Sequence, residues 1–352
     1  MINNNANLSS RGGNIIQKGR QTWVFEAPPY LVSSAAVGGT MEKAGPLAEG
    51  FDYFFSSNRA GQDTFEQAEQ VMLEKACNLA LEKAKWSAGE VDMFLAGDLM
   101  NQITSSGFTA RNIGIPYLGI FAACGTSMQG LALASLLVAS QASKKVMAAT
   151  GSHNCTAERQ FRYPTEYGAQ KPPYCQYTAT AAGAGIVSYD QESPIQITAA
   201  TIGKVIDLNI KDPFNMGAAM APAAANTISA HLEERGVPVD YYDLIITGDL
   251  GQVGHQILFD LLEYKGIFLS KEKYVDCGCL LYSDNKEVFS GGSGCGCAAA
   301  VTYGHFAKLL TANKLQKIFV VSTGALLSPV SSEQKESIPG IAHGVALERR
   351  GV

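Results

Sequence analysis

The sequence predicts an α/β protein built from two similar halves, each with a sheet covered by helices. Strand-like runs alternate with helical ones along the chain, which is typical of βαβ units and a parallel sheet. Two pairs of strands recur in the same order in the two parts of the chain. With 352 residues, 46% hydrophobic and only 17% charged, the chain has enough apolar side chains for a large core, and a disordered protein is excluded.

The first elements alternate as βαβ units require. Apolar residues recur at three- and four-residue steps over Phe65–Trp86, which predicts an amphipathic helix. Buried strands are expected over Val91–Ala96, Tyr117–Ala123 and Lys145–Ala149. A helix from about Gly125 to Ser143 is apolar on every face, so we expect it to lie inside the protein.

The repeat comprises two strands in each half. The stretch from Gly89 to Leu99 and the stretch from Val239 to Leu250 both end their strand in Gly-Asp-Leu. Further on, a strand running into a glycine turn occurs at 144–152 and again at 316–325. We interpret the halves as copies of one module that bring two central helices together at a pseudo-twofold axis.

The repeat divides the chain into three parts. We predict a loose polar tail over residues 1–20, an N-terminal half over 21–190 and a C-terminal half over 191–352.

Charge and composition exclude several classes of protein. The net charge of −5 gives no reason to expect nucleic acid as a partner. Eight cysteines are too sparse for a disulfide-built scaffold. No signal peptide is recognisable at the start, and the longest apolar run, Gly130–Ala139, is about half of the roughly 20 residues that a membrane span needs. We expect a soluble protein made in a reducing compartment.

Cys124 stands between a buried strand and the start of the apolar helix. The helix dipole and the unpaired N–H groups there favour a thiolate, and they suit a bound carboxylate equally well. Ser127 lies in the first turn of the same helix. The alternative is that Cys124 is a small buried core residue, as many cysteines are.

A polar, tyrosine-rich segment follows the strand at 145–149 and extends to Tyr177. It carries His153, Arg159 and Arg162 in a chain that is otherwise poor in charge. Long loops are usually functional or disordered, and these cations near a helix N-terminus would form an anion pocket. A surface or dimer-interface loop with ordinary ion pairs to nearby glutamates is the alternative.

Two Cys-Gly-Cys stretches, at 277–279 and 295–297, raise the question of a zinc site. The spacing has one residue between the cysteines rather than two, and the second pair lies in a run of small residues. Packing against a neighbouring helix is therefore the favoured interpretation, and we predict neither a metal nor a cofactor.

A strand followed by Ala-Cys-Gly and an apolar central helix, within a duplicated βαβ module, resembles the thiolase superfamily, with the ketoacyl synthase III branch nearest. The resemblance covers the chain after residue 20 and implies a five-layer αβαβα fold. In that family the cysteine, here Cys124, is acylated by a coenzyme A or carrier-protein thioester. A His and an Asn, or two His, then stabilise the enolate of the second substrate.

The partners of that cysteine are not matched. The family's first His follows the strand here at 243–247, where the turn contains Asp249, and His255 falls several residues late. The second partner's position matches Gly291–Ser293, where no imidazole or amide stands. Loss of a positioned acid or base typically removes 10²–10⁴ in rate. We therefore predict a non-catalytic site for a small anion, with an acyltransferase or condensing enzyme using Cys124 as the alternative.

Longer strings, among them 156–168, 220–225 and 323–329, are similar to the stage V sporulation protein AD family of spore-forming bacteria. This resemblance implies binding of dipicolinic acid (pyridine-2,6-dicarboxylic acid), alone or with calcium, and a role in its uptake into the developing spore. It also implies membrane-embedded partners from the same operon, a peripheral place at the spore inner membrane, and a homodimer. A scaffold that binds no small molecule is a third possibility.

Dipicolinate is a flat dianion that needs two carboxylate sites and an aromatic-sized slot. We expect the helix N-terminus to hold one carboxylate, the cations after the strand at 145–149 to hold the other, and Asp249 to meet a calcium ion. The residues predicted to form the site are Cys124, Ser127, His153, Arg159, Arg162, Asp249, Gly292 and Ser293.

Overall fold

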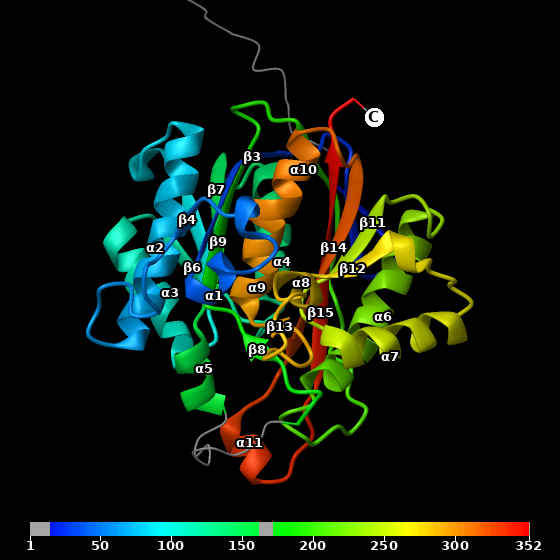
Figure 1. The fold of residues 1–352 in the computed structure, drawn as a ribbon. Coiled ribbons are helices and arrows are strands. Elements are labelled where there is room, and N and C mark those ends of the chain that lie inside the picture. The colour runs from blue at the N-terminus through cyan, green and yellow to red at the C-terminus, as the bar shows by residue number, and fades with distance from the viewer. Residues whose placement is uncertain (1–14, 162–171, 352) are drawn as a thin grey trace, which may run out of the picture.

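The computed structural model describes residues 15–161 and 172–351. Five layers follow one another across the molecule in Figure 1: two outer helices, a sheet, central helices, a second sheet and two more outer helices. The αβαβα fold class is therefore confirmed. The layer-forming helices are α2 (Phe65–Ala84) and α3 (Thr104–Ile113) on one side, α4 (Thr126–Ala139) and α9 (Cys295–Ala300) in the centre, and α6 (Met216–Arg235) and α7 (Gly251–Tyr264) on the other.

Among the described residues thirteen strands pair with one another, and ten of them form two five-stranded sheets whose order is the same on either side of the centre. Outward from the centre the first sheet runs β3-β9-β7-β5-β6 and the second β10-β15-β14-β11-β12. A single residue pair, Tyr30 with Gln196, joins them. The strands are β3 (Tyr30–Gly38), β5 (Met93–Gly97), β6 (Tyr117–Gly119), β7 (Lys145–Ser152), β9 (Ala181–Ser188), β10 (Ile195–Thr201), β11 (Leu244–Thr247), β12 (Tyr274–Asp276), β14 (Lys317–Ala325) and β15 (Gly340–Arg349).

Both sheets are mixed rather than purely parallel. The strands β5, β6 and β7 run parallel, as do β11, β12 and β14. The last strand of each half, β9 or β15, pairs antiparallel with both of its neighbours. The predicted boundary at residue 190 falls between β9 and β10.

Smaller elements complete the chain. The short strands are β1 (Ile15–Lys18), β2 (Thr22–Phe25), β4 (Tyr53–Phe54), β8 (Tyr177–Thr178) and β13 (Gly292–Ser293). The short helices are α1 (Thr40–Lys43), α5 (Asn154–Phe161), α8 (Cys277–Leu281), α10 (Ala307–Thr311) and α11 (Pro329–Glu333), with a π-helical turn at Val301–Phe306 and 3₁₀ turns at Ala48–Gly50, Ala88–Glu90, Asn101–Ile103 and Lys271–Lys273. Within the described ranges, no helix combines the length and the apolar content that crossing a membrane requires.

Three segments differ from their predicted form. Residues 15–18, expected in the loose tail, pair with β2 as strand β1. The strand expected over Tyr117–Ala123 ends at Gly119, because the following residues leave the sheet and turn toward α4. Part of the segment expected to be a loop between 151 and 177 forms α5, and this helix decides which of its side chains reach the site.

The two central helices are enclosed by both sheets. Every residue of α9 is buried, and α4 packs against β7 and β9 of one half and β14 and β15 of the other. Ser322 of β14 fixes the start of α4, because its hydroxyl donates to the Gly125 carbonyl at 2.7 Å and accepts from the Met128 amide at 3.2 Å. The N-terminus of α4 therefore lies in the interior, where the two halves meet.

Candidate ligand-binding site at Cys124

Cys124 lies in a sharp turn immediately before α4. The preceding Ala123 has φ +49°, a left-handed conformation that is uncommon for a residue other than glycine. Thr126 holds the turn, because its hydroxyl accepts from the Ala122 amide at 2.9 Å and donates to the Ala123 carbonyl at 2.7 Å. The Cys124 side chain is thereby aimed at the junction of the two halves, where the residue is only 5% exposed.

Two groups from the C-terminal half face the sulfur. Cys124 Sγ lies 3.8 Å from Ser293 Oγ, and this hydroxyl donates to Asp249 Oδ2 at 3.0 Å. The Gly294 amide donates to the same oxygen at 2.9 Å, and Thr323 Oγ1 donates to Oδ1 at 2.7 Å. The structure therefore brings together three of the residues predicted from the sequence: Cys124, Asp249 and Ser293.

The electrostatics of this group oppose a thiolate. Burial raises the pKa of Asp249 from its ordinary 3.8 to about 6, although hydrogen bonds from Thr323, Cys124 and Gly294 oppose the shift. Burial, followed by the Asp249 carboxylate, raises the pKa of the Cys124 thiol well above its ordinary value. Of the two alternatives left open by the sequence, the buried core thiol is therefore favoured over a thiolate, because desolvation and a neighbouring negative charge oppose the helix dipole.

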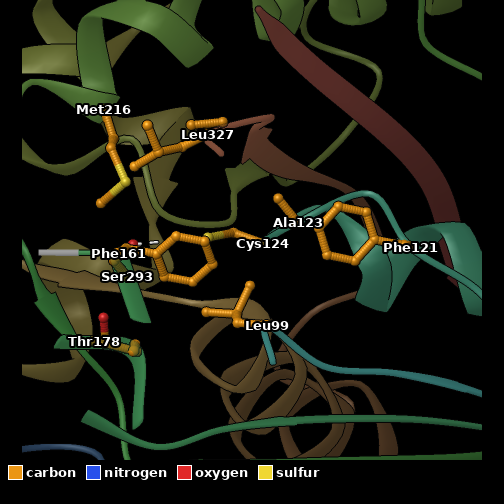
Figure 2. Close-up of a pocket in the computed structure, with 11 residues that line it drawn as sticks. Leu99, Phe121, Ala123, Cys124, Phe161, Thr178, Met216, Ser293 and Leu327 are labelled. Atoms are coloured by element: carbon orange, nitrogen blue, oxygen red, sulfur yellow. Dashed lines mark hydrogen bonds between the residues drawn. The ribbon is translucent and has the colours of Figure 1, made fainter. Parts of the chain in front are cut away.

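The cavity beside Cys124 is small and mostly apolar. Figure 2 shows Leu99, Phe161 and Leu327 around the sulfur. The volume of about 30 Å³ holds about two water molecules. No cationic side chain and no imidazole is among the described residues that line it, namely Leu99, Phe121, Ala123, Cys124, Ala157, Phe161, Thr178, Met216, Ser293, Ala325 and Leu327.

A second cavity of about 420 Å³ adjoins the first. The two share the walls formed by Leu99, Phe121, Phe161 and Leu327, so these side chains separate the small cavity from the large one. None of these four residues is among the site residues predicted from the sequence. A signal for Leu99 was present, because it closes the Gly-Asp-Leu turn that corresponds to the turn of Asp249.

Two of the predicted cations do not reach the cavity. Arg159, on α5, is 64% exposed in its side chain and forms an ion pair with Glu66 of α2. The buried His153 ring bonds to the Asn58 carbonyl through Nε2 at 2.7 Å and accepts from the Cys155 amide through Nδ1 at 3.1 Å. The expected anion pocket built on these two residues is therefore wrong, and Arg162 lies outside the described residues.

The remaining predicted residues, Ser127 and Gly292, do not line the cavity. Ser127, in the first turn of α4, is buried, and its hydroxyl has no hydrogen-bond partner among the described residues. Gly292 pairs with Tyr177 between β13 and β8, directly before Ser293. Among the described residues, no group of three or more His, Cys, Asp or Glu side chains is placed to hold a metal ion.

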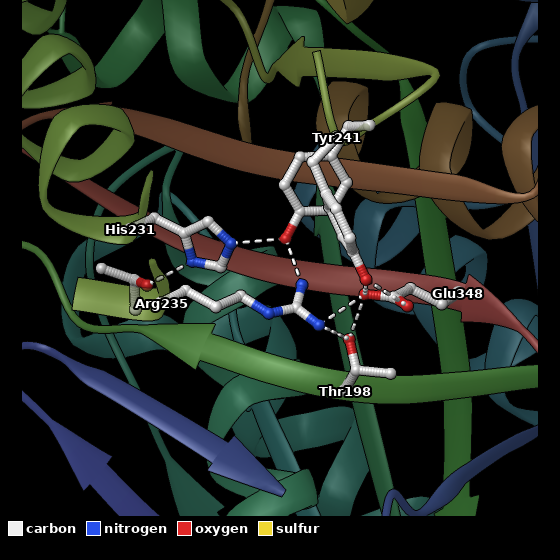
Figure 3. A network of polar contacts seen from close by, with 7 residues as sticks. Thr198, His231, Arg235, Tyr241 and Glu348 are labelled. Atoms are coloured by element: carbon white, nitrogen blue, oxygen red, sulfur yellow. Dashed lines mark hydrogen bonds and ion pairs between the residues drawn. The ribbon is translucent and has the colours of Figure 1, made fainter. Parts of the chain in front are cut away.

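A buried polar network lies in the C-terminal half, in the contact between α6 and the sheet (Figure 3). Arg235 donates to the Tyr242 hydroxyl, so that this hydroxyl gives its own proton to His231 Nε2 at 2.6 Å. The other ring nitrogen, Nδ1, then donates to Thr201 Oγ1 at 2.7 Å. Burial, followed by Arg235, lowers the pKa of His231 well below its ordinary value. The neutral His231 therefore supports the fold rather than the site.

Comparison with known proteins gives one family and one fold. The family model described as Stage V sporulation protein AD (SpoVAD) matches residues 19–348. The chain is 50% identical over 333 residues to Stage V sporulation protein AD of Bacillus subtilis (strain 168). This match covers 95% of this chain and 98% of the relative.

Solved structures show the fold alone, at low identity. The 3-oxoacyl-[acyl-carrier-protein] synthase III from Aquifex aeolicus VF5 superposes with a TM-score of 0.54 at 16% identity, over 80% of this chain and 84% of that chain. A variant of Xanthomonas campestris OleA superposes with a TM-score of 0.57 at 10% identity, over 95% of this chain and 99% of that chain. The overall fold of this chain is therefore the thiolase-like fold of these two proteins.

Proposed function

The chain belongs to the stage V sporulation protein AD family, and on this premise we propose that it is a non-catalytic binding protein for dipicolinic acid that serves the uptake of this compound into the developing spore. The ligand occupies the cavity beside Cys124 after its apolar walls move apart. The observation that carries the non-catalytic part of the proposal is the contact of the Cys124 sulfur with Ser293, whose hydroxyl donates to the Asp249 carboxylate.

This contact argues against turnover. A condensing reaction builds negative charge on an enolate oxygen, which hydrogen-bond donors must stabilise. An ionised carboxylate is an acceptor only, and the Ser293 hydroxyl already directs its proton to Asp249. The neutral thiol of Cys124 is in addition a weak nucleophile. The arrangement therefore supports binding rather than acyl transfer.

The walls of the cavity support a flat, aromatic ligand. Phe121 and Phe161 offer ring faces, and Leu99 and Leu327 offer aliphatic surface. Burial of the pyridine ring against these side chains would supply most of the affinity, at roughly 25 cal/mol per Å² of apolar surface. A cavity of about 30 Å³ is too small for the ring, so the walls shared with the adjoining 420 Å³ cavity must shift.

The two negative charges of dipicolinate need positive charge nearby. The described residues that line the cavity include no cationic side chain, so other groups must provide it. The N-terminus of α4 offers partial positive charge to one carboxylate. A proton on Asp249, whose pKa is about 6, removes a like charge next to the ligand. Calcium bound together with dipicolinate would cancel both ligand charges and present a hard cation to carboxylate oxygens. We include the calcium complex as a form of the ligand.

Isothermal titration calorimetry with dipicolinate, with and without calcium, tests the proposal. Ala157 of α5 is 5% exposed and lines the cavity, so Ala157→Phe fills the space and should abolish binding. Arg159→Ala, two residues along the same helix and facing outward, is the matched control and should bind like the wild type. The absence of binding by the wild type, or unchanged binding by Ala157→Phe, would contradict the proposed site.

An acyltransferase that uses Cys124 as nucleophile is the second candidate function. The observation that favours it is the turn itself, because the left-handed Ala123 presents the sulfur at the start of α4, where a helix dipole assists a nucleophile. Incubation with acyl-coenzyme A would yield an acylated Cys124 and turnover if this function were correct.

We also propose that the protein acts at the spore inner membrane with membrane-embedded proteins of the same operon, and that it does so as a homodimer. Family membership supports these points. Sedimentation velocity measures the oligomeric state, and a sedimenting monomer would refute the dimer. Fractionation of spore membranes with and without these proteins tests the location, and unchanged membrane association in their absence would refute dependence on them.

A further inference from the structure

Gln176 connects three segments beside the site. It directly precedes β8 and is 2% exposed. Its Nε2 donates to the Asp249 carbonyl at 2.6 Å and to the Gly292 carbonyl at 2.9 Å. One side-chain amide group therefore holds the turn after β11 and the strand β13 at the same time.

The backbone around this amide group is fitted closely to it. Gly251 has φ +64°, and a Cβ at this position would lie 3.1 Å from Gln176 Nε2 and 2.3 Å from the Ser290 carbonyl oxygen. A side chain at residue 251 would therefore push the turn away from the amide group. The Tyr177 amide extends the contact by donating to the Gly291 carbonyl at 2.9 Å.

Each carbonyl held by Gln176 belongs to a segment that carries a group facing Cys124. The first carbonyl is that of Asp249 itself, and the second, that of Gly292, directly precedes Ser293. The two segments meet where Ser293 Oγ donates to Asp249 Oδ2 at 3.0 Å. The amide group of Gln176 thus fixes the main chain on both sides of this hydrogen bond.

We propose that Gln176 is a positioning residue of the ligand site, which holds Asp249 and Ser293 against Cys124 by bonding the main-chain carbonyls of both segments. Without it, the two buried carbonyls lose a shared donor, the segments separate, and water reaches the Asp249 carboxylate. The sulfur of Cys124 then loses the dry, negatively charged surroundings that keep it protonated. The inference rests on the proposed function only in its prediction for dipicolinate.

A matched pair of variants separates positioning from general stability. Gln176→Leu removes both hydrogen bonds to the carbonyls. Gln21→Leu is the control, because Gln21 is also a buried glutamine, 8% exposed, whose Nε2 donates to the Ile202 carbonyl at 3.0 Å and to Asn226 Oδ1 at 3.4 Å. Gln21 does not line the cavity. Both variants bury an unpaired carbonyl, so both should lose stability.

The first measurement needs no ligand. The rate of alkylation of Cys124 by iodoacetamide is followed from pH 6 to pH 10 by mass spectrometry of the peptide that contains it. We expect Cys124 of Gln176→Leu to be alkylated at least tenfold faster than Cys124 of the wild type at pH 8. The midpoint of the rate against pH should also lie at lower pH in this variant. Gln21→Leu should follow the wild-type profile. An unchanged profile of Gln176→Leu, or an equal acceleration in Gln21→Leu, would overturn the proposal.

Gln176→Met keeps the length of the side chain and serves if Gln176→Leu does not fold. The thioether has no proton to donate to the two carbonyl oxygens and adds no charge, so alkylation of Cys124 at pH 8 should accelerate in the same way. Wild-type reactivity of this variant at pH 8 would overturn the proposal.

The second measurement is the affinity for dipicolinate by titration calorimetry. We expect a loss of at least tenfold in Gln176→Leu and less than twofold in Gln21→Leu. If the wild type binds no dipicolinate, the proposed function fails while the alkylation profile still decides the role of Gln176. If the wild type binds and both measurements leave Gln176→Leu unchanged, the proposed function stands and the role of Gln176 is refuted.

Discussion

Replacement of Asp249 by asparagine is expected to remove most of the loss of stability that the wild type suffers between acidic and neutral pH, so that the variant gains on the wild type as the pH rises. Burial raises the pKa of Asp249 from 3.8 to about 6. In the window between these values the folded protein binds more protons than the unfolded chain, so stability falls as the pH rises. Above about pH 6 the full cost of the buried charge is present. The side chain of the variant would carry no charge in either state.

The magnitude follows from the two pKa values. A difference of 2.2 between 3.8 and about 6, at about 1.36 kcal/mol for each pKa unit, gives a cost of about 3 kcal/mol for the ionised form. For 352 residues, an unfolding entropy of about 2.1 cal/mol/K per residue makes this about 4 °C in Tm. Asp249→Asn should therefore gain about 2–3 kcal/mol on the wild type between pH 4 and pH 7.5.

Urea unfolding of both proteins at several pH values from 4 to 7.5 measures this difference. Asp240→Asn is the control, because Asp240 is exposed and its replacement should leave the pH dependence unchanged. If the difference in free energy of unfolding between Asp249→Asn and the wild type is the same at every pH in this range, the account of a buried, charged Asp249 beside Cys124 is refuted.

Two further predictions concern binding and the fold. Affinity for calcium-free dipicolinate should rise as the pH falls from 8 to below 6, because protonation of Asp249 removes a like charge; a pH-independent Kd by calorimetry would contradict this. His231→Ala should lower the free energy of unfolding by about 2–4 kcal/mol, because it leaves the Tyr242 and Thr201 hydroxyls without their buried partner. Urea titration checks this, and wild-type stability with altered dipicolinate affinity would contradict a purely structural role.

The local parts of the site could be predicted from the sequence. The strand, the cysteine and the apolar helix follow one another in the chain, so the residue pattern around Cys124 was enough to predict the turn there. The turns that carry Asp249 and Ser293 follow recognisable strand and glycine signals, and the fold brings both to Cys124. The order of strands and turns along the two halves of a thiolase-like fold was enough to place Cys124, Asp249 and Ser293 together.

Side-chain direction in the segment after β7 could not be predicted, because the segment was expected to be a loop. Once Asn154–Phe161 forms α5, residues two positions apart point in different directions. Phe161 consequently lines the cavity, whereas Arg159 turns outward to Glu66. The protonation of Cys124 stays open in the sequence for a related reason, since it depends on burial between the two halves and on Asp249 from the other half of the chain.

Intact-mass spectrometry after incubation with acyl-coenzyme A decides whether the cavity at Cys124 binds or reacts. The buried neutral thiol, faced by Ser293 and Asp249 instead of an imidazole, predicts an unmodified mass and no consumption of the thioester, while dipicolinate added to the same sample is still bound. An acyl group on Cys124, followed by its transfer and repeated turnover, would contradict a site that only binds.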